Sequence, residues 1–162
     1  IRVDSRPGLG TTFRLYFPIV AGDAVHRQSA TDDAGPAAAV RRRGLVLLAD
    51  DEDSVRHASA GLLRHLGYDV AAVSDGAAAV EEFSSRPERF AACVLDLTMP
   101  QMDGNAAARG IREIRRDIPI LFASGYTRSE IDPALARDEC VGFLAKPFSL
   151  AALANGLASI GV

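Results

Sequence analysis

From residue 45 to the end of the chain, short apolar runs alternate with longer segments in which apolar residues recur every three or four positions. The short runs are typical of strands buried on both faces, and the longer segments of amphipathic helices. Strands are predicted at residues 45–49, 69–73, 91–96, 119–123 and 142–145. Because these units have short connections, the pattern predicts an α/β fold, a doubly wound five-stranded parallel sheet with helices on both faces.

A helix is predicted after each strand, which gives five, at residues 54–66, 76–84, 104–115, 128–137 and 149–160. The fourth segment contains Pro133, which would permit only a first turn before it. Each of three helices has an apolar face expected to pack on the sheet. These faces consist of Val55, Ala58, Leu62 and Leu66 in the first helix, Ile111 and Ile114 in the third, and Leu150, Leu153, Leu157 and Ile160 in the last.

Composition excludes several classes of protein. The chain has 162 residues, of which 48% are hydrophobic, and a formal net charge of −3. This charge is too small to favour nucleic acid, and no apolar run reaches the roughly 18 residues of a membrane span. The first residues lack the pattern of a signal peptide, and Cys93 and Cys140 lack the spacing of metal ligands or a disulfide scaffold. We expect a cytoplasmic protein with reduced thiols and no contact with nucleic acid or membrane.

The N-terminal quarter differs from the rest of the chain. Residues 1–18 alternate apolar and polar around a turn at 5–10, with Phe13, Leu15 and Phe17 on one face, which predicts a hairpin. Residues 22–44 show no periodicity and are rich in Ala, Asp, Ser and Gly, which predicts a linker. Its three consecutive arginines are interpreted as solvated rather than as a nucleic-acid contact. The predicted organisation is therefore a hairpin unit at 1–20, a flexible linker at 21–43 and an α/β domain at 44–162.

Polar residues stand at the carboxyl ends of four predicted strands. Asp50 and Asp51 follow the first, Asp96 ends the third, Ser124 follows the fourth and Lys146 the fifth. Doubly wound sheets bind ligands beyond these ends. Close carboxylates repel one another unless a cation lies between them, and an all-oxygen site suits Mg²⁺. Taken singly, the aspartates could be caps, Ser124 part of a turn and Lys146 a solvated side chain, but their coincidence at four strand ends favours one site.

Four motifs resemble those of response-regulator receiver domains in two-component phosphorelays. They are LLADDE at 47–52, VLDLTMPQMDG at 94–104, FASGY at 122–126 and FLAKPF at 143–148. The resemblance covers residues 44–162 and implies a flavodoxin-like sheet with strand order 2-1-3-4-5. It also implies that Asp96 is the phosphoacceptor, that Asp51, Asp96 and the backbone carbonyl of Thr98 bind Mg²⁺ directly, and that Asp50 supports the ion through water.

The same resemblance implies a conformational switch. Ser124 is the switch hydroxyl, Phe143 the switch aromatic residue and Lys146 the contact to the phosphoryl group. The family more often has Thr and Tyr at the two switch positions, and Phe143 has no hydroxyl, so coupling through it must be steric. Phosphoryl transfer depends on positioning and charge neutralisation, which a carboxylate nucleophile, Mg²⁺ and a lysine together supply. The implied phosphodonor is a histidine kinase or a histidine phosphotransfer domain.

A second, shorter resemblance concerns residues 4–13, DSRPGLGTTF, which are similar to the closing hairpin of a histidine-kinase ATPase domain. It implies that the chain is the C-terminal piece of a hybrid sensor histidine kinase. The piece itself lacks the rest of an ATP pocket and is not expected to be a kinase, although a receiver accepts a phosphoryl group and can lose it by autodephosphorylation. None of its three histidines lies in a phosphoacceptor motif.

Two alternatives remain open, a stand-alone single-domain response regulator and a receiver-like module that binds proteins without being phosphorylated. A nucleotide or flavin domain is disfavoured because the first strand is followed by four acidic residues, 50–53, rather than by glycines. An aspartyl phosphatase is disfavoured because Thr98 stands where such enzymes usually have a second acid.

Two further expectations concern the C-terminal region. The Lys146–Pro147 bond is expected to be cis, which would aim Lys146 into the site. Residues 147–162 contain no charged residue. The small residues on the outer side of the last helix could therefore contact a kinase helix or a second receiver, giving self-association, or form plain solvent surface. These outer residues are Ala151, Ala154, Asn155, Ala158 and Ser159.

Overall fold

The computed structural model describes residues 2–6, 8, 10–14, 16, 43–125 and 127–162. The chain divides into two compact units, residues 1–37 and 38–162. Each unit is considered by itself. No helix in the described parts of the chain is both long and apolar enough to cross a membrane.

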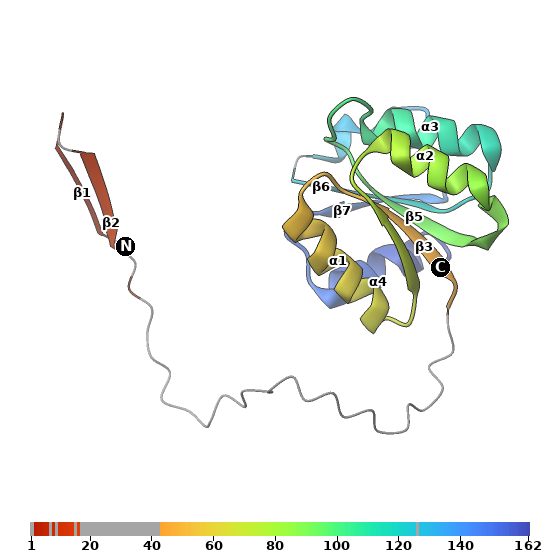
Figure 1. Ribbon diagram of the computed structural model, residues 1–162, viewed down its shortest axis with the longest axis horizontal. Helices are drawn as coiled ribbons and strands as arrows, with labels where there is room; N and C mark the ends of the chain where they lie inside the picture. Colours follow the sequence, from red (N-terminus) through yellow and green to blue (C-terminus); the bar gives the residue numbers. More distant parts are fainter. Residues whose placement is uncertain (1, 7, 9, 15, 17–42, 126) are drawn as a thin grey trace, which may run out of the picture. The chain divides into compact units, whose positions relative to one another are not determined.

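The larger unit contains a five-stranded sheet in the spatial order β4-β3-β5-β6-β7, with every neighbouring pair parallel (Figure 1). Counted along this unit, the order is 2-1-3-4-5, which confirms the predicted topology. The strands are β3 (Leu45–Ala49), β4 (Asp69–Val73), β5 (Phe90–Asp96), β6 (Ile120–Ser124) and β7 (Val141–Ala145). β3, β5 and β6 are almost wholly buried, as expected for apolar runs covered on both faces.

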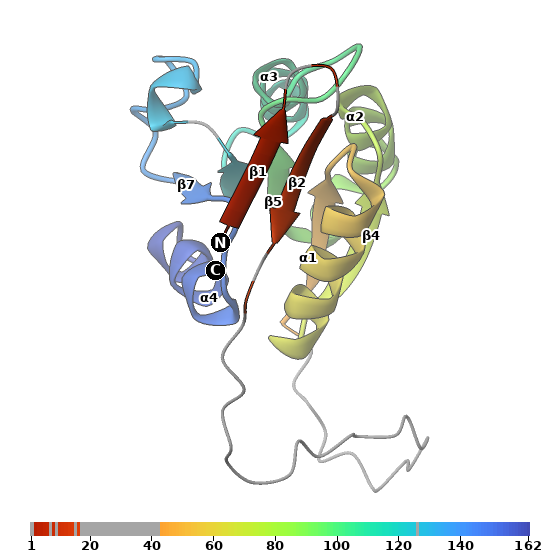
Figure 2. The same cartoon turned by 90° about the vertical axis from the view of Figure 1, so that its left-hand side faces the viewer.

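Within the described part of the larger unit, four α-helices cover the sheet, α1 and α4 on one face and α2 and α3 on the other (Figure 1 and Figure 2). They are α1 (Asp53–His65), α2 (Gly76–Ser85), α3 (Gly104–Ile114) and α4 (Leu150–Ser159). The side chains of Asp75, Asp103 and Ser149 accept a hydrogen bond from a backbone N–H in the first turn of α2, α3 and α4, respectively. These capping bonds explain why the three helices begin at these points.

The core lies in two layers, one on each face of the sheet. Phe83 of α2 and Ile111 of α3 are fully buried against one face, and Leu63 of α1 and Leu153 of α4 against the other. Helices packed on both faces leave the carboxyl edge of the sheet to the connecting loops, which is where the predicted site lies.

The predicted helix at residues 128–137 is wrong, so five helices become four in the described part of the chain. Only a short 3₁₀ helix, η2 (Arg128–Glu130), forms there, followed by turns. Pro133 prevents a continuous helix. The segment is held instead by Asn105 of α3, which donates to the carbonyl of Glu130 at 2.9 Å and accepts from the N–H of Asp132 at 2.8 Å. The side chain of Leu135 is buried and packs in the core.

The predicted inward face of α3 is correct at Ile111 but wrong at Ile114, whose side chain is 42% exposed. The buried side of the helix consists of Ala107, Ala108 and Ile111. One turn beyond Ile111 the chain has Arg115, which donates to the carbonyls of Pro87 and Phe90 at 3.2 and 2.9 Å. These bonds fix the end of the helix with Ile114 turned to solvent.

The predicted inward face of α1 is correct at Leu62 and Leu66, which pack against the core, but wrong at Ala58. Leu63 is fully buried and Ala60 nearly so, whereas Ala58 is exposed. Val55 and Leu62 are half-buried and line a surface groove, and Leu62 packs against the core as well. The apolar surface of the helix is thus wider than the part that is buried on the sheet.

The smaller unit contains the predicted hairpin, with β1 (Arg2–Arg6) antiparallel to β2 (Gly10–Arg14). Val3 and Phe13 are directly paired across the two strands, and their side chains are 54% and 64% exposed. Leu15, Phe17 and nearly all of the predicted linker lie outside the described residues, so the predicted domain boundaries stay predictions.

Candidate functional site

Three carboxylates gather at the carboxyl edge of the sheet. Asp96 ends β5, and Asp50 and Asp51 follow β3, which pairs directly with β5 through Ala49 and Leu95. One carboxylate oxygen of each aspartate lies within 4.8 Å of the others. Asp50 and Asp96 are buried, whereas Asp51 is exposed. The strand pairing therefore brings together the three acids that the sequence placed at two strand ends.

Lys146 joins this cluster from the end of β7. Its Nζ donates to Asp50 Oδ2 at 2.5 Å and to Asp96 Oδ2 at 2.9 Å. Its backbone N–H donates to the carbonyl of Ser124 at 2.8 Å, and the Lys146–Pro147 bond is cis, as predicted. Lys146 is also the only lysine in the chain. Sequence reasoning missed the bond to Asp50, since it assigned this lysine to the phosphoryl group alone.

The contacts within the cluster change the proton affinities of Lys146 and Asp50. Burial by itself would lower the pKa of Lys146, but the hydrogen bonds and charges of Asp50 and Asp96 outweigh it and place the pKa above its ordinary value. For Asp50 burial is the largest effect and raises the pKa, helped by the charge of Asp96 and only partly offset by Lys146. The ionised cluster is therefore under electrostatic strain that a further cation would relieve.

The loop after β5 fixes the side chain of Asp96. The N–H of Thr98 donates to Asp96 Oδ1 at 3.2 Å, and the N–H of Gly104 donates to the carbonyl of Leu97 at 3.0 Å. A Cβ atom on Gly104 would lie 2.2 Å from the carbonyl oxygen of Asp96. Only glycine fits this approach. The sequence indicated Gly104 as part of the turn after the strand, but not its close contact with Asp96.

The two predicted switch residues lie on the neighbouring strands. Ser124 is the last residue of β6 and is fully buried. Phe143 is half-buried in β7, beside Phe122 of β6 in the strand register, and packs against the core cluster on the α2 and α3 side. Both residues are thus within two strands of Asp96, one in contact with the backbone of Lys146 and the other three residues before it.

The donor set fits a hard divalent cation. The cluster offers carboxylate oxygens from Asp50, Asp51 and Asp96 and contains neither histidine nor cysteine. Mg²⁺ prefers such oxygen ligands, uses only one or two carboxylates and retains water. The exposed Asp51 leaves room for that water, so these residues fit Mg²⁺ better than a transition metal.

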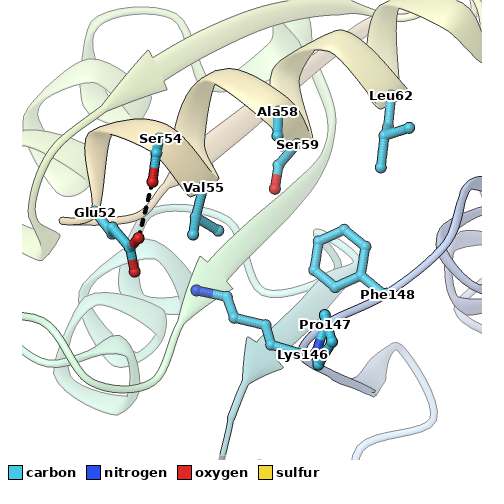
Figure 3. A pocket seen from close by; sticks show the side chains of 9 residues that line it. All are labelled: Glu52, Ser54, Val55, Ala58, Ser59, Leu62, Lys146, Pro147 and Phe148. Atoms are coloured by element: carbon cyan, nitrogen blue, oxygen red, sulfur yellow. Dashed lines mark hydrogen bonds between the residues drawn. The ribbon is translucent and has the colours of Figure 1, made fainter. Parts of the chain in front are cut away.

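A groove of about 420 Å³ lies beside the cluster, between α1 and the turn from β7 into α4. Figure 3 shows Lys146, Pro147 and Phe148 on one side, facing Val55 and Leu62 of α1. The groove is mostly apolar, and Lys146 links it to the acidic cluster. Sequence reasoning missed the groove because it assigned this side of α1 to the core.

A doubly wound sheet with an acidic cluster and a lysine at its carboxyl edge defines a receiver-type domain. The model of the response regulator receiver domain family matches residues 46–158. The chain belongs to this family, and its relatives place it in two-component signalling.

Relatives of two kinds match the chain. Sensor kinase CckA of Brucella abortus (strain 2308) is 35% identical over 166 residues, covering 96% of this chain and 17% of that kinase. The receiver protein CpdR of the same strain is 34% identical over 110 residues, covering 68% of this chain and 90% of CpdR. The chain is therefore close to receivers of both hybrid kinases and single-domain regulators.

A solved structure adds an observation on the metal. The receiver domain of a sensor histidine kinase from Pseudomonas aeruginosa PAO1 has 31% identity and a TM-score of 0.62, covering 74% of this chain and 98% of that one. In that structure a magnesium ion is coordinated in the active-site cleft.

The raised pKa of Asp50 predicts how stability depends on pH in the metal-free protein. Because the folded-state pKa lies above 3.8, the stability contribution of Asp50 is complete below pH 3.8 and is lost as pH rises through the folded-state pKa. Asp50→Asn should therefore become more stable relative to wild type as pH rises across this range. Urea unfolding of both proteins with a chelator at a series of pH values measures the difference, and parallel pH profiles would contradict it.

Proposed function

We propose that this chain is a phosphoacceptor receiver, which takes a phosphoryl group from a phosphohistidine onto Asp96 with the help of Mg²⁺. The observation that carries the proposal is the pair of bonds from Lys146 Nζ to Asp50 and Asp96. They place the one ammonium group at the acids where charge develops in the transfer.

In the proposed reaction a carboxylate oxygen of Asp96 attacks the phosphorus atom. The new O–P bond forms as the P–N bond to histidine breaks, and the electron pair of that bond stays on the imidazole nitrogen. Asp51, Asp96 and the Thr98 carbonyl would hold Mg²⁺, with Asp50 supporting the ion through water, and the ion would neutralise charge on the phosphoryl oxygens. Lys146 exchanges its bond to Asp96 for one to a phosphoryl oxygen, and it remains charged because its pKa is raised.

The conformational response is proposed to run through Ser124 and Phe143. A phosphoryl group on Asp96 adds acceptor oxygens at the end of β5, and Ser124 lies at the adjacent end of β6. Movement of the Ser124 hydroxyl toward these oxygens draws the following loop inward. Phe143 then changes its packing against the core without any hydroxyl to bond, so the signal is steric.

The proposed partner is the phosphohistidine-bearing helix of a histidine kinase or phosphotransfer domain. The groove between α1 and Phe148 is apolar, and it opens beside Lys146. An amphipathic helix fits such a groove and would bring its phosphohistidine to the acidic cluster.

The proposed location is the cytoplasm. Both cysteines are free, and Cys93 is buried. Free thiols are typical of proteins in that reducing compartment.

The wider context proposed is the C-terminal part of a hybrid sensor kinase. The match to CckA covers 96% of the chain and so includes residues before the receiver. Within the hairpin, the paired Val3 and Phe13 expose an apolar surface that two strands alone cannot bury. A larger sheet or helix layer, as in a kinase ATPase domain, would cover it. The second candidate, a single-domain regulator, is favoured by the 90% coverage of CpdR.

The proposal predicts metal-dependent self-labelling of the whole chain. Incubation with acetyl phosphate and Mg²⁺ should add one phosphoryl group, because a small phosphodonor needs only the nucleophile and charge neutralisation. Intact-protein mass spectrometry measures the product, and peptide mapping after borohydride reduction locates it. A chelator should abolish labelling. Equal labelling with and without the chelator would rule out the metal-assisted reaction.

A further inference from the structure

Arg56, in the first turns of α1, folds its side chain back onto the loop that carries two of the acids. Its Nη1 donates to the backbone carbonyl of Asp50 at 2.7 Å and lies 3.5 Å from the carbonyl oxygen of Asp51. Its Nη2 donates to the carboxylate of Asp53. The side chain is only 17% exposed. Arg56 therefore spans the acidic loop on its backbone side.

These contacts complete the set that fixes the loop. The N–H of Asp50 donates to the carbonyl of Val73 at 3.2 Å, and the N–H of Glu52 donates to Asp50 Oδ1 at 3.1 Å. Arg56 bonds the carbonyl of Asp50 and approaches that of Asp51. Together these bonds restrain the backbone from which the Asp50 and Asp51 side chains start.

The positive charge of Arg56 and its hydrogen bonds are expected to have opposite effects on Mg²⁺ affinity. A guanidinium group close to the loop repels a divalent cation at the neighbouring carboxylates, so removing the charge alone would tighten Mg²⁺ binding. Removing the hydrogen bonds would free the loop and weaken binding. The sign of the change in affinity therefore distinguishes positioning from simple electrostatics.

We propose that Arg56 is a positioning residue for the metal site, which acts through the carbonyls of Asp50 and Asp51 and outweighs its own repulsion of the cation. This inference rests on the proposed function, because it assumes that Mg²⁺ binds at these acids. Arg56 contacts neither the metal nor the reacting atoms.

The test is the dissociation constant of Mg²⁺, measured by isothermal titration calorimetry at a temperature where every variant is folded. Arg56→Met keeps most of the apolar stem and removes the bonds, so it should bind Mg²⁺ about tenfold more weakly. Arg56→Lys keeps the charge but loses the planar fork and should also bind more weakly. Asp53→Asn removes the ion pair and leaves the carbonyl contacts, so it should bind like wild type.

The outcomes are distinct. Unchanged or tighter binding by Arg56→Met overturns the inference, and so does wild-type binding by Arg56→Lys, because the contacts of the planar guanidinium group with the two carbonyls would then be unnecessary. Should Arg56→Met fail to fold, Arg56→Lys alone decides the question. Wild-type protein that binds no Mg²⁺ overturns the proposed metal site itself, whereas wild-type binding with an unaltered Arg56→Met overturns only the role of Arg56.

Discussion

Asp96→Asn is expected to abolish labelling by acetyl phosphate while leaving the fold intact. The amide is not a nucleophile toward phosphorus, and Asp96, held by the N–H of Thr98 and by Lys146, is the acid proposed to attack. Asp50 is held in a similar way, by the N–H of Glu52 and by Lys146, but its proposed role is to support the ion through water. Intact-protein mass spectrometry with Mg²⁺ present measures the loss. Glu88→Gln, a change in the short 3₁₀ helix η1 (Pro87–Arg89), is a matched control that should label like wild type.

The same variant should keep its stability within about 1 kcal/mol, or gain some. The charge of Asp96 raises the pKa of Asp50, so its removal relieves repulsion between two buried carboxylates. The lost bond to Lys146 opposes this gain, while Lys146 keeps its bond to Asp50. Full labelling of Asp96→Asn would disprove the acceptor assignment, and a large loss of stability would show that Asp96 is chiefly structural.

The topology could be predicted because the strands of the larger unit are short, largely apolar runs that alternate with longer helical segments. The predicted bounds of β3 and β4 agree with the structure at both ends. Carboxyl strand ends then located Asp50, Asp96 and Lys146 without any knowledge of side-chain directions. The strand order and parallel pairing then predicted that these three residues lie close together, because they make the strand ends neighbours.

Other features depend on tertiary contacts that no local pattern records. The segment after β6 was predicted to form a helix. Instead, the side chain of Asn105, the second residue of α3, forms hydrogen bonds with the backbone of this segment. Two sides of α1 are apolar, and only packing decides that Leu63 enters the core while Leu62 lines the groove. Hydrophobic periodicity predicts that such a helix forms more reliably than it predicts which side of the helix faces the core.

The bond between Lys146 and Asp50 could not be predicted from the sequence. The pattern placed Lys146 at a strand end and the expected cis bond aimed it into the site, but that its ammonium group bonds both Asp50 and Asp96 depends on the tertiary structure. The ammonium group thus stands between two carboxylates, where it neutralises part of their charge.

Because Lys146 bonds two carboxylates, Lys146→Ala is expected to have large effects on both labelling and stability. Labelling by acetyl phosphate should slow about a hundredfold, the loss typical of removing one preorganised charge-stabilising group. Metal-free stability should fall by about 2 kcal/mol, because two buried carboxylates lose their common partner and the lysine is 17% exposed, which moderates the loss. Labelling rates and urea unfolding with a chelator measure the two effects.

The loss of stability should depend on pH and on metal in a defined way. Since the pKa of Lys146 is raised, its contribution is complete below 10.5 and is lost only as pH rises through the still higher folded-state pKa. The difference between wild type and Lys146→Ala should therefore persist at neutral pH and shrink in strong alkali. Mg²⁺ should restore more stability to Lys146→Ala than to wild type, because the cation replaces the missing charge.

We expect the switch to need the bond from Lys146 to the new phosphoryl oxygens as well as the bond from Ser124, so phosphorylation of Lys146→Ala should leave Phe143 unchanged, even when prolonged incubation labels Asp96. Lys146 directly follows β7, the strand that carries Phe143, and without its ammonium group this strand loses its link to the phosphoryl group. NMR spectra of the Ser124 and Phe143 signals, before and after labelling, measure this response against wild type. Since the chain has a single lysine, the wild-type Nζ signal can be followed without overlap. Wild-type shifts in labelled Lys146→Ala would show that the switch runs through Ser124 alone.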